Sequence, residues 1–329
     1  MNPTTSIYRS TGRARALRLR RLGMAVAASA LSAGALAGPA LAGAATPADA
    51  SGNFAFQTVD NQKDVTFNQL LGINDADTIA GYFGSGMNGH PNQGYTLHVT
   101  FDSENFPGAA QTQVTGLNNT GATVGFWVDK KGANHGFYSI GGKSFQTADY
   151  PAMAPAKPAV DQLLGVNDHD LAVGFYTDAK GNSHGYTYDI STHRYSQVMV
   201  AGDTNVTAAA VNNNGDVAGF ATNAAGATEG FLTFPSGRVV HLNVPGATTT
   251  QAFGVNDGDE VVGAYTVGKG KNATSTGFTW SPGFGFASVS DPKGIGSTTI
   301  NGVNNRGVLV GFYTDSKGNT DGLVARPQE

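Results

Sequence analysis

A short phrase that recurs six times constrains this chain more than any other feature. It reads Gly72-Ile73-Asn74-Asp75 in its first copy, and the asparagines of the six copies are Asn74, Asn118, Asn167, Asn212, Asn256 and Asn304. These asparagines are 44, 49, 45, 44 and 48 residues apart. A Gly follows each one after seven residues, and another, usually before an aromatic residue, follows after eighteen to twenty-one. A repeat of about 40–50 residues predicts one β-propeller blade per copy.

Turn residues divide each repeat into four strand candidates. In the second repeat the candidates are Thr112–Leu117, Thr123–Val128, Gly136–Ile140 and Ser144–Ala148. Gly and Asn stand between them, and both accept the positive-φ backbone that tight hairpins require. The 46 glycines and the low charged fraction, 13%, also suit short strands joined by turns. The chain is therefore predicted to be all-β, with four-stranded antiparallel blades.

The two ends of the repeat region predict how the blades close. The sixth repeat stops after Gly322–Ala325, its third strand, and lacks a fourth. A spare strand, Phe54–Asp60, precedes the first repeat and resembles the fourth strand of the second repeat, Ser144–Asp149. It would complete the last blade, and closure removes the open sheet edges of a linear stack. We therefore predict a closed six-bladed β-propeller, with a β-solenoid as the alternative.

The repeats resemble a known family. His135-Gly136-Phe137 and His184-Gly185-Tyr186, the latter with Gly-Val-Asn upstream, are similar to the bacterial extracellular repeats named HAF, as is Val244–Thr248. The resemblance covers about residues 54–326. It implies an exported repeat protein and supplies no reaction, because the family has no established activity. Four repeats depart at the His position, with Gln93, Glu229, Thr276 and Asp321, so the resemblance implies no general role for that His.

The first 42 residues have the pattern of an export signal. Six arginines and no acidic residue precede an apolar run from Met24 to Ala37, and Ala40-Leu41-Ala42 supplies the small residues of a cleavage site. The pair Arg20-Arg21 leaves a twin-arginine route open beside general secretion. We expect a signal peptide at 1–42, a linker at 43–53 and the propeller at 54–329, in a secreted protein.

Charge and composition limit the partners. The chain after residue 42 keeps 14 basic and all 24 acidic residues, a net charge of −10. An acidic chain without basic clusters argues against nucleic acid and anionic membranes as partners. The absence of Cys leaves core burial and sheet closure as the sources of stability. We expect a monomer without a membrane span and without a cofactor.

Loops of variable length concentrate on one face of the predicted ring. Turns between second and third strands (B–C) and crossings between blades (D–A) share this face, and Gly84–Gln93, Val267–Thr276 and Tyr150–Asp161 are its longest loops. Loops on a rigid scaffold are common binding sites. The ligand-binding candidates are the residues of this face that can stack or hydrogen-bond: His90, Tyr150, Asp129, His135, Asp178 and His184.

Two Asp–His pairs bracket B–C turns. Asp129 pairs with His135, and Asp178 with His184. Such a pair could serve acid–base chemistry, but its repetition in separate blades favours a structural clamp across the hairpin.

The A–B turns, between first and second strands, offer candidate metal ligands. Three repeats carry Asp-x-Asp (Asp75 and Asp77, Asp168 and Asp170, Asp257 and Asp259) and the other three carry Asn-x-Gly. Paired carboxylates could bind Ca²⁺. Because Gly cannot ligate and all three residue types suit turns, the pattern favours a turn over a metal site.

The sequence leaves three functions open. We expect a non-enzymatic module that binds a glycan or another extracellular or cell-surface partner. The second hypothesis is a carbohydrate hydrolase or lyase that uses acidic residues at the channel mouth, drawn from Glu104, Asp161, Asp203, Glu229 and Asp291. The third is a structural envelope scaffold. The chain has no His-Glu-x-x-His and no phosphate loop, so neither of these motifs supports the enzyme hypothesis.

Overall fold

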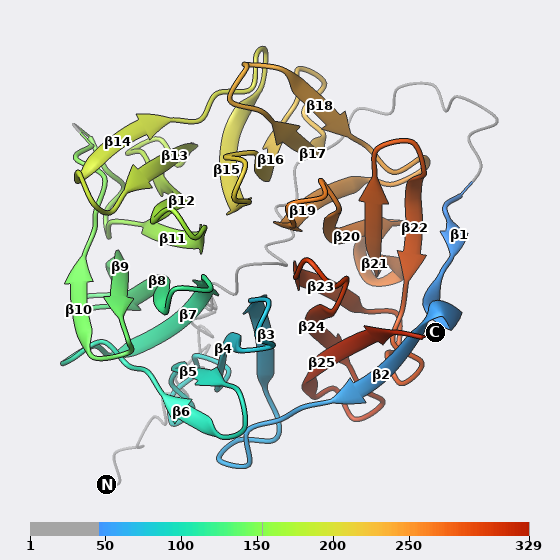
Figure 1. The fold of residues 1–329 in the computed structure, drawn as a ribbon, viewed down its shortest axis with the longest axis horizontal. Coiled ribbons are helices and arrows are strands. Elements are labelled where there is room, and N and C mark those ends of the chain that lie inside the picture. The colour runs from blue at the N-terminus through green and yellow to red at the C-terminus, as the bar shows by residue number, and fades with distance from the viewer. Residues whose placement is uncertain (1–45, 153, 329) are drawn as a thin grey trace, which may run out of the picture. The chain divides into compact units, whose positions relative to one another are not determined.

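The computed structural model describes residues 46–152 and 154–328, and the predicted signal peptide lies outside them. In the described part the regular elements are strands, apart from two short 3₁₀ helices, η1 (Ser51–Asn53) and η2 (Gly270–Asn272). No helix in that part is long and apolar enough to span a membrane. The strands form six antiparallel blades arranged around a common axis (Figure 1).

Each blade runs outward from an inner strand. Blade 1 contains β3 (Asn68–Ile73), β4 (Ile79–Phe83), β5 (Gln93–Leu97) and β6 (Phe101–Ser103). Blade 2 contains β7 (Gln111–Leu117), β8 (Ala122–Val128), β9 (Asn134–Ile140) and β10 (Ser144–Thr147). Blade 3 contains β11 (Asp161–Val166), β12 (Leu171–Thr177), β13 (Ser183–Asp189) and β14 (Arg194–Gln197). The strands of blade 2 agree with the predicted ones to within two residues.

The second half of the ring repeats this pattern. Blade 4 contains β15 (Thr204–Val211), β16 (Val217–Thr222), β17 (Thr228–Thr233) and β18 (Val239–Leu242). Blade 5 contains β19 (Thr249–Val255), β20 (Val261–Val267), β21 (Thr274–Ser281) and β22 (Gly285–Val289). Blade 6 contains β23 (Thr298–Val303), β24 (Leu309–Thr314), β25 (Thr320–Pro327) and the N-terminal β2 (Phe54–Thr58). One parallel pair, Thr228 with Thr249, joins the sheets of blades 4 and 5.

The N-terminal strand closes the ring, as predicted. β2 pairs antiparallel with β25 from Phe54 opposite Pro327 to Thr58 opposite Leu323. The side chains of Phe54 and Phe56 pack on a buried cluster that includes Leu323. The last blade therefore combines the two ends of the described chain. Closure also gives β25 a hydrogen-bonded partner at what would otherwise be a free edge.

Part of the segment expected to be a linker, residues 43–53, is paired with the ring. A two-residue strand, β1 (Ala48–Asp49), runs parallel to β22, and Ser51 Oγ accepts a hydrogen bond from the Ser290 N–H at 2.9 Å. Residues 48–51 thus contact blade 5 before the chain enters β2.

The repeated glycines stand where backbones approach each other. Every inner strand has a β-bulge just before the first Gly of the phrase, or before Ala210 in blade 4. A Cβ on Gly116 would lie 2.9 Å from Cα of Gly165 in the next blade. A Cβ on Gly125, seven residues after Asn118, would lie 2.0 Å from the carbonyl oxygen of Gln113. Side chains are therefore excluded by neighbouring backbone at both positions.

The core is divided among the blade interfaces. In the cluster between blades 2 and 3, Val124 from β8 packs with Leu163 from β11 and Tyr186 from β13. All three side chains are fully buried. Since each cluster draws on two sheets, the blades stabilise one another rather than folding around separate cores.

Candidate functional site

Six asparagines join the inner strands at the axis. Asn118 is representative: its side-chain oxygen accepts hydrogen bonds from the N–H groups of Thr120 and Ala122, which closes its own A–B turn. Its amide group donates to the carbonyl oxygen of Asn167, the equivalent residue of the next blade, at 2.9 Å. The same bond recurs at every blade interface, and the last runs from Asn304 to Asn74. The repeated Asn therefore closes the turn of its own blade and also hydrogen-bonds to the next blade.

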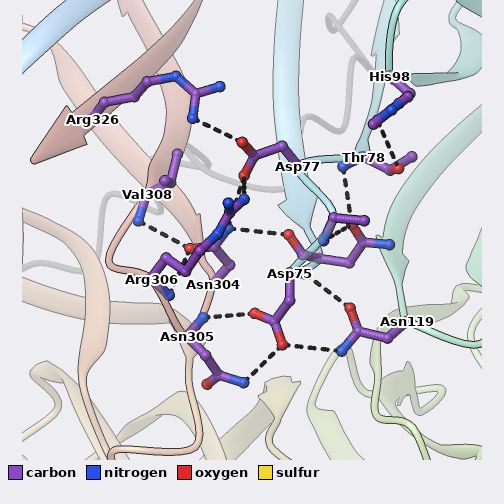
Figure 2. A network of polar contacts seen from close by, with 12 residues as sticks. Asp75, Asp77, Thr78, His98, Asn119, Asn304, Asn305, Arg306, Val308 and Arg326 are labelled. Carbon is purple, nitrogen blue, oxygen red and sulfur yellow. Dashed lines mark hydrogen bonds and ion pairs between the residues drawn. The ribbon is translucent and has the colours of Figure 1, made fainter.

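The next residue of each repeat forms a second ring, in which Asp and Asn alternate. The Asp75 N–H donates to Asn119 Oδ1 at 2.9 Å, and each further member donates in the same way to the member of the next blade. The amide groups of Asn119, Asn213 and Asn305 each donate to the carboxylates on both sides. Figure 2 shows Asp75 between Asn119 and Asn305.

The alternation is explained by complementary chemistry. A carboxylate only accepts hydrogen bonds, and an amide NH₂ group offers two donors. Burial acts to raise the pKa of Asp168, but hydrogen bonds from Asn119 and Asn213 outweigh it and hold the pKa below its usual value. The ring, which we call the axial Asp–Asn ring (Asp75, Asn119, Asp168, Asn213, Asp257, Asn305), places each carboxylate between two amide donors beside the axis.

Two small cavities lie along the axis. The first, of about 70 Å³, is lined by the axial Asp–Asn ring together with the six asparagines before it. The second, of about 90 Å³, is lined by the inner strands, including their Gly residues and apolar neighbours such as Leu71 and Phe253. None of the six residues predicted to bind ligand lines either cavity.

The second Asp of each Asp-x-Asp pair occupies a special backbone position. Asp77, Asp170 and Asp259 have φ angles of 58°, 59° and 60°, and the glycines at the equivalent positions are also left-handed. Asp77 forms ion pairs with Arg306 and with Arg326, the latter at 2.9 Å (Figure 2). Burial acts to raise its pKa, but the two arginines outweigh this and lower it. This carboxylate ties the first blade to the sixth.

On the opposite face, the predicted His–Asp pairs are present with one change of partner. His184 Nε2 lies 3.1 Å from Asp178 Oδ2, across the hairpin as expected. His135 Nδ1 instead lies 2.7 Å from Asp149 Oδ2, while its Nε2 is 3.9 Å from Asp129 Oδ2. Sequence reasoning missed Asp149 because it lies outside the hairpin, just after the following strand β10.

The remaining two candidates are placed differently. His90 is exposed, and its Nδ1 lies 2.9 Å from Asp64 Oδ2. Tyr150 is half-buried, and one face of its ring is covered by Tyr176 at a centroid distance of 4.5 Å.

Two equivalent stacks of three rings line the B–C and D–A face, in blades 2 and 3. In the first, His135 stacks on Trp127 and Trp127 on Phe106, both at 4.5 Å. In the second, His184 stacks on Tyr176 at 4.9 Å and Tyr176 on Tyr150 at 4.5 Å. We call them the His135 stack (Phe106, Trp127, His135) and the His184 stack (Tyr150, Tyr176, His184). The shared signal in the sequence is an aromatic residue before Pro in each crossing, Phe106-Pro107 and Tyr150-Pro151.

Beneath the His184 stack lies a buried carboxyl group. Asp161 Oδ1 accepts a hydrogen bond from the Tyr186 hydroxyl at 2.5 Å, and Oδ2 accepts one from the Tyr150 N–H at 2.7 Å. Burial raises the pKa of Asp161 to about 7. Both oxygens already bind protein donors, so this carboxyl group positions the crossing rather than facing a substrate.

Comparisons with known proteins define the fold class. No family model matches the chain, nor does any curated protein, so the HAF resemblance depends on the residues quoted above. Among solved structures, the chain is similar to the SapL1 lectin in complex with α-methyl fucoside, at 8% identity and a TM-score of 0.53 over 80% of this chain and 93% of the lectin. It is also similar to the six-bladed lectin of Aleuria aurantia, at 9% identity, TM-score 0.48 and 78% and 91% coverage.

The solved structure of an enzyme is also similar to this chain. A streptogramin B lyase matches at 9% identity and a TM-score of 0.45, over 85% of this chain and the whole of the lyase. The chain is a six-bladed β-propeller, the fold that it shares with the SapL1 lectin. At such identities the likeness concerns the fold alone.

Proposed function

We propose that the chain is an exported, non-enzymatic module that binds a glycan, or another extracellular component, through its B–C and D–A face. The observation that carries the proposal is the pair of stacks. Each ends in a partly exposed imidazole that is hydrogen-bonded to a carboxylate, on the face opposite the axial Asp–Asn ring. Export rests on the signal-like pattern of residues 1–42.

The chemistry of the stacks suits a sugar. A pyranose ring presents an apolar C–H face, which packs on flat rings, and hydroxyl pairs, which bind carboxylates and imidazoles. Asp149 and Asp178 supply such acceptors at the ends of the two stacks. Because the stacks repeat in adjacent blades, two similar sugar residues, or two branches, could bind in equivalent ways, and avidity would add to a weak single site.

The enzyme hypothesis receives less support from the same face. Asp161 has a raised pKa, as a catalytic acid would, but its two oxygens bind Tyr186 and Tyr150. The lectin in complex with a fucoside shares the fold with this chain and supplies a precedent for sugar binding by the architecture, without assigning fucose here.

A glycan array with the purified chain tests this proposal. We expect a reproducible set of glycans to bind, and His135→Ala and His184→Ala each to reduce the signal at least fivefold. His98→Ala is the matched control, because His98 is an exposed histidine on the opposite face. A blank array with folded protein would refute glycan binding. Equal losses in all three variants would refute the assignment to this face.

A further inference from the structure

Three side chains from separate elements of blade 4 converge on the B–C and D–A face. Asp203 lies in the crossing before β15, Glu229 at the start of β17 and His241 on β18. Each offers one ligand atom, and these atoms lie within 4.8 Å of one another. Within residues 46–152 and 154–328 this is the one such group of His, Asp and Glu side chains. His241 Nδ1 lies 2.7 Å from Glu229 Oε1.

The group is held by a second layer of contacts. The Glu229 side chain is only 11% exposed, and its other oxygen accepts a hydrogen bond from the Asn223 amide at 3.0 Å. The carboxylates of Asp203 and Glu229 are brought together in partly buried surroundings, where a cation would relieve their repulsion. Outer hydrogen bonds that orient ligands in this way are common around bound metals.

Blade 4 obtains this group by departing from the repeat. At the position of Glu229, blades 2 and 3 have His135 and His184, each near an acidic residue in the B–C turn. Blade 4 reverses the pair: the acid is on the strand and Asn223 occupies the turn position. The imidazole then comes from β18, and Asp203 is added from the crossing. A single asymmetric group in a repetitive ring is the arrangement expected of a specific site.

We propose that Asp203, Glu229 and His241 bind a divalent transition-metal ion such as Zn²⁺. One imidazole nitrogen and two carboxylate oxygens are ligands that Zn²⁺ takes readily, whereas Ca²⁺ takes oxygen ligands. Three protein ligands leave a coordination position for water or a bound molecule. Ligands of one Zn²⁺ lie roughly 3–3.5 Å apart, so the His241–Glu229 pair would open slightly on binding the ion.

Calorimetry with metal ions tests the site. The full chain is purified without a histidine tag, treated with a chelator and titrated with Zn²⁺, and in parallel with Ca²⁺. We expect one Zn²⁺ per chain and no Ca²⁺ binding at this site. Asp203→Asn, Glu229→Gln and His241→Ala should each weaken Zn²⁺ binding at least tenfold. Circular dichroism establishes that each variant is folded.

His135→Ala is the matched control. It removes a histidine with two nearby aspartates that do not form a group of three close ligand atoms, and Zn²⁺ affinity should be unchanged. The proposal is overturned if the chain binds no Zn²⁺, or if the three ligand variants bind it as tightly as the parent. It is also overturned if His135→Ala lowers the affinity as much as they do. The stacks belong to blades 2 and 3 and the proposed metal site to blade 4. Failure of glycan binding therefore leaves the metal site untouched, and failure of Zn²⁺ binding leaves the glycan proposal untouched.

Discussion

Asp75 and Asn119, which are 44 residues apart, are joined by a reciprocal pair of hydrogen bonds. The Asp75 N–H donates to Asn119 Oδ1 at 2.9 Å, and Asn119 Nδ2 donates to Asp75 Oδ2 at 3.1 Å. The bond that binds two blades therefore uses both side chains and one backbone, and it depends on one partner being an acid and the other an amide.

A variant that breaks this complementarity should destabilise the ring. Asn119→Asp removes two donated hydrogen bonds and places a carboxylate between Asp75 and Asp168. We expect the free energy of unfolding at pH 7 to fall by about 2–4 kcal/mol, with part of the loss recovered at pH 5 as the new acid takes up a proton. Urea denaturation measures both. Asn272→Asp, at an exposed position, is the control, and equal stability of the two variants would contradict the account.

The same ring predicts the response to calcium. Both oxygens of Asp75 already accept hydrogen bonds, from the Asn305 backbone and from the amides of Asn119 and Asn305. We expect millimolar Ca²⁺ to leave the Tm unchanged. A rise in Tm that a chelator reverses, and that Asp75→Asn abolishes, would show that the Asp-x-Asp turns do bind the ion.

A methyl group at the Gly that follows each repeated Asn by seven residues should destabilise the fold. Gly125→Ala would place its Cβ 2.0 Å from the Gln113 carbonyl oxygen, so the bulged strand β7 or its neighbour must move. We expect a loss of about 3 kcal/mol or more in the free energy of unfolding. Gly52→Ala is the control, because nothing lies within 4 Å of its added Cβ. Similar denaturation midpoints for both variants would show that the close approach of the Gln113 carbonyl oxygen does not exclude a side chain at position 125.

Deleting the closing strand should open the ring. Removal of residues 51–59 takes away β2, the outer antiparallel partner of β25, and removes Phe54 and Phe56 from the core. We expect loss of a single cooperative unfolding transition and concentration-dependent association through the free edge, detected by light scattering. Removal of residues 46–50, which include only β1, is the comparison. If both deletions unfold alike and remain monomeric, β2 is not the closing element.

The stability of the protein should depend on pH through Asp161. Burial raises the pKa of this carboxyl group to about 7, whereas in the unfolded chain it is near 3.9. The folded state therefore binds this proton more tightly than the unfolded chain does. The contribution of Asp161 to the free energy of unfolding is fully present below about pH 4. It declines as the pH rises through 7, by up to about 4 kcal/mol. Asp161→Asn imitates the protonated acid and should flatten this decline.

Denaturation of the parent and of Asp161→Asn across pH 4–8 gives the difference in their free energies of unfolding at each pH. The contributions of other titrating groups largely cancel in this difference. Asp102→Asn, at an exposed position on β6, should leave the decline intact. Parallel curves for the parent and Asp161→Asn would contradict a raised pKa at this position.

The fold could be predicted because its constraints are local to each repeat. A Gly equivalent to Gly125 and an Asn equivalent to Asn118 recur at fixed positions in every copy. Neighbouring backbone leaves no room for a side chain at Gly125, and the side chain of Asn118 closes a turn. The spare strand Phe54–Asp60 then supplied the topology. Turn and crossing lengths also showed which face carries the variable loops.

The partners within the candidate sites were harder to predict. His184 and Asp178 share one hairpin, so their pairing follows from a separation of six residues. The pairing of His135 with Asp149 depends on the register between β9 and β10 and on the path of the chain beyond it. Glu229 and His241 lie on two strands and Asp203 in a crossing, and their convergence requires the folded blade.

The axial Asp–Asn ring also limits how such a chain can evolve. An acid must alternate with an amide all the way around, and this is possible only with an even number of blades. Loss or gain of one repeat would bring two aspartates, or two asparagines, side by side at the junction. Repeats in a ring of this chemistry should therefore be added or lost in pairs, so that the unit of inheritance is two blades rather than one.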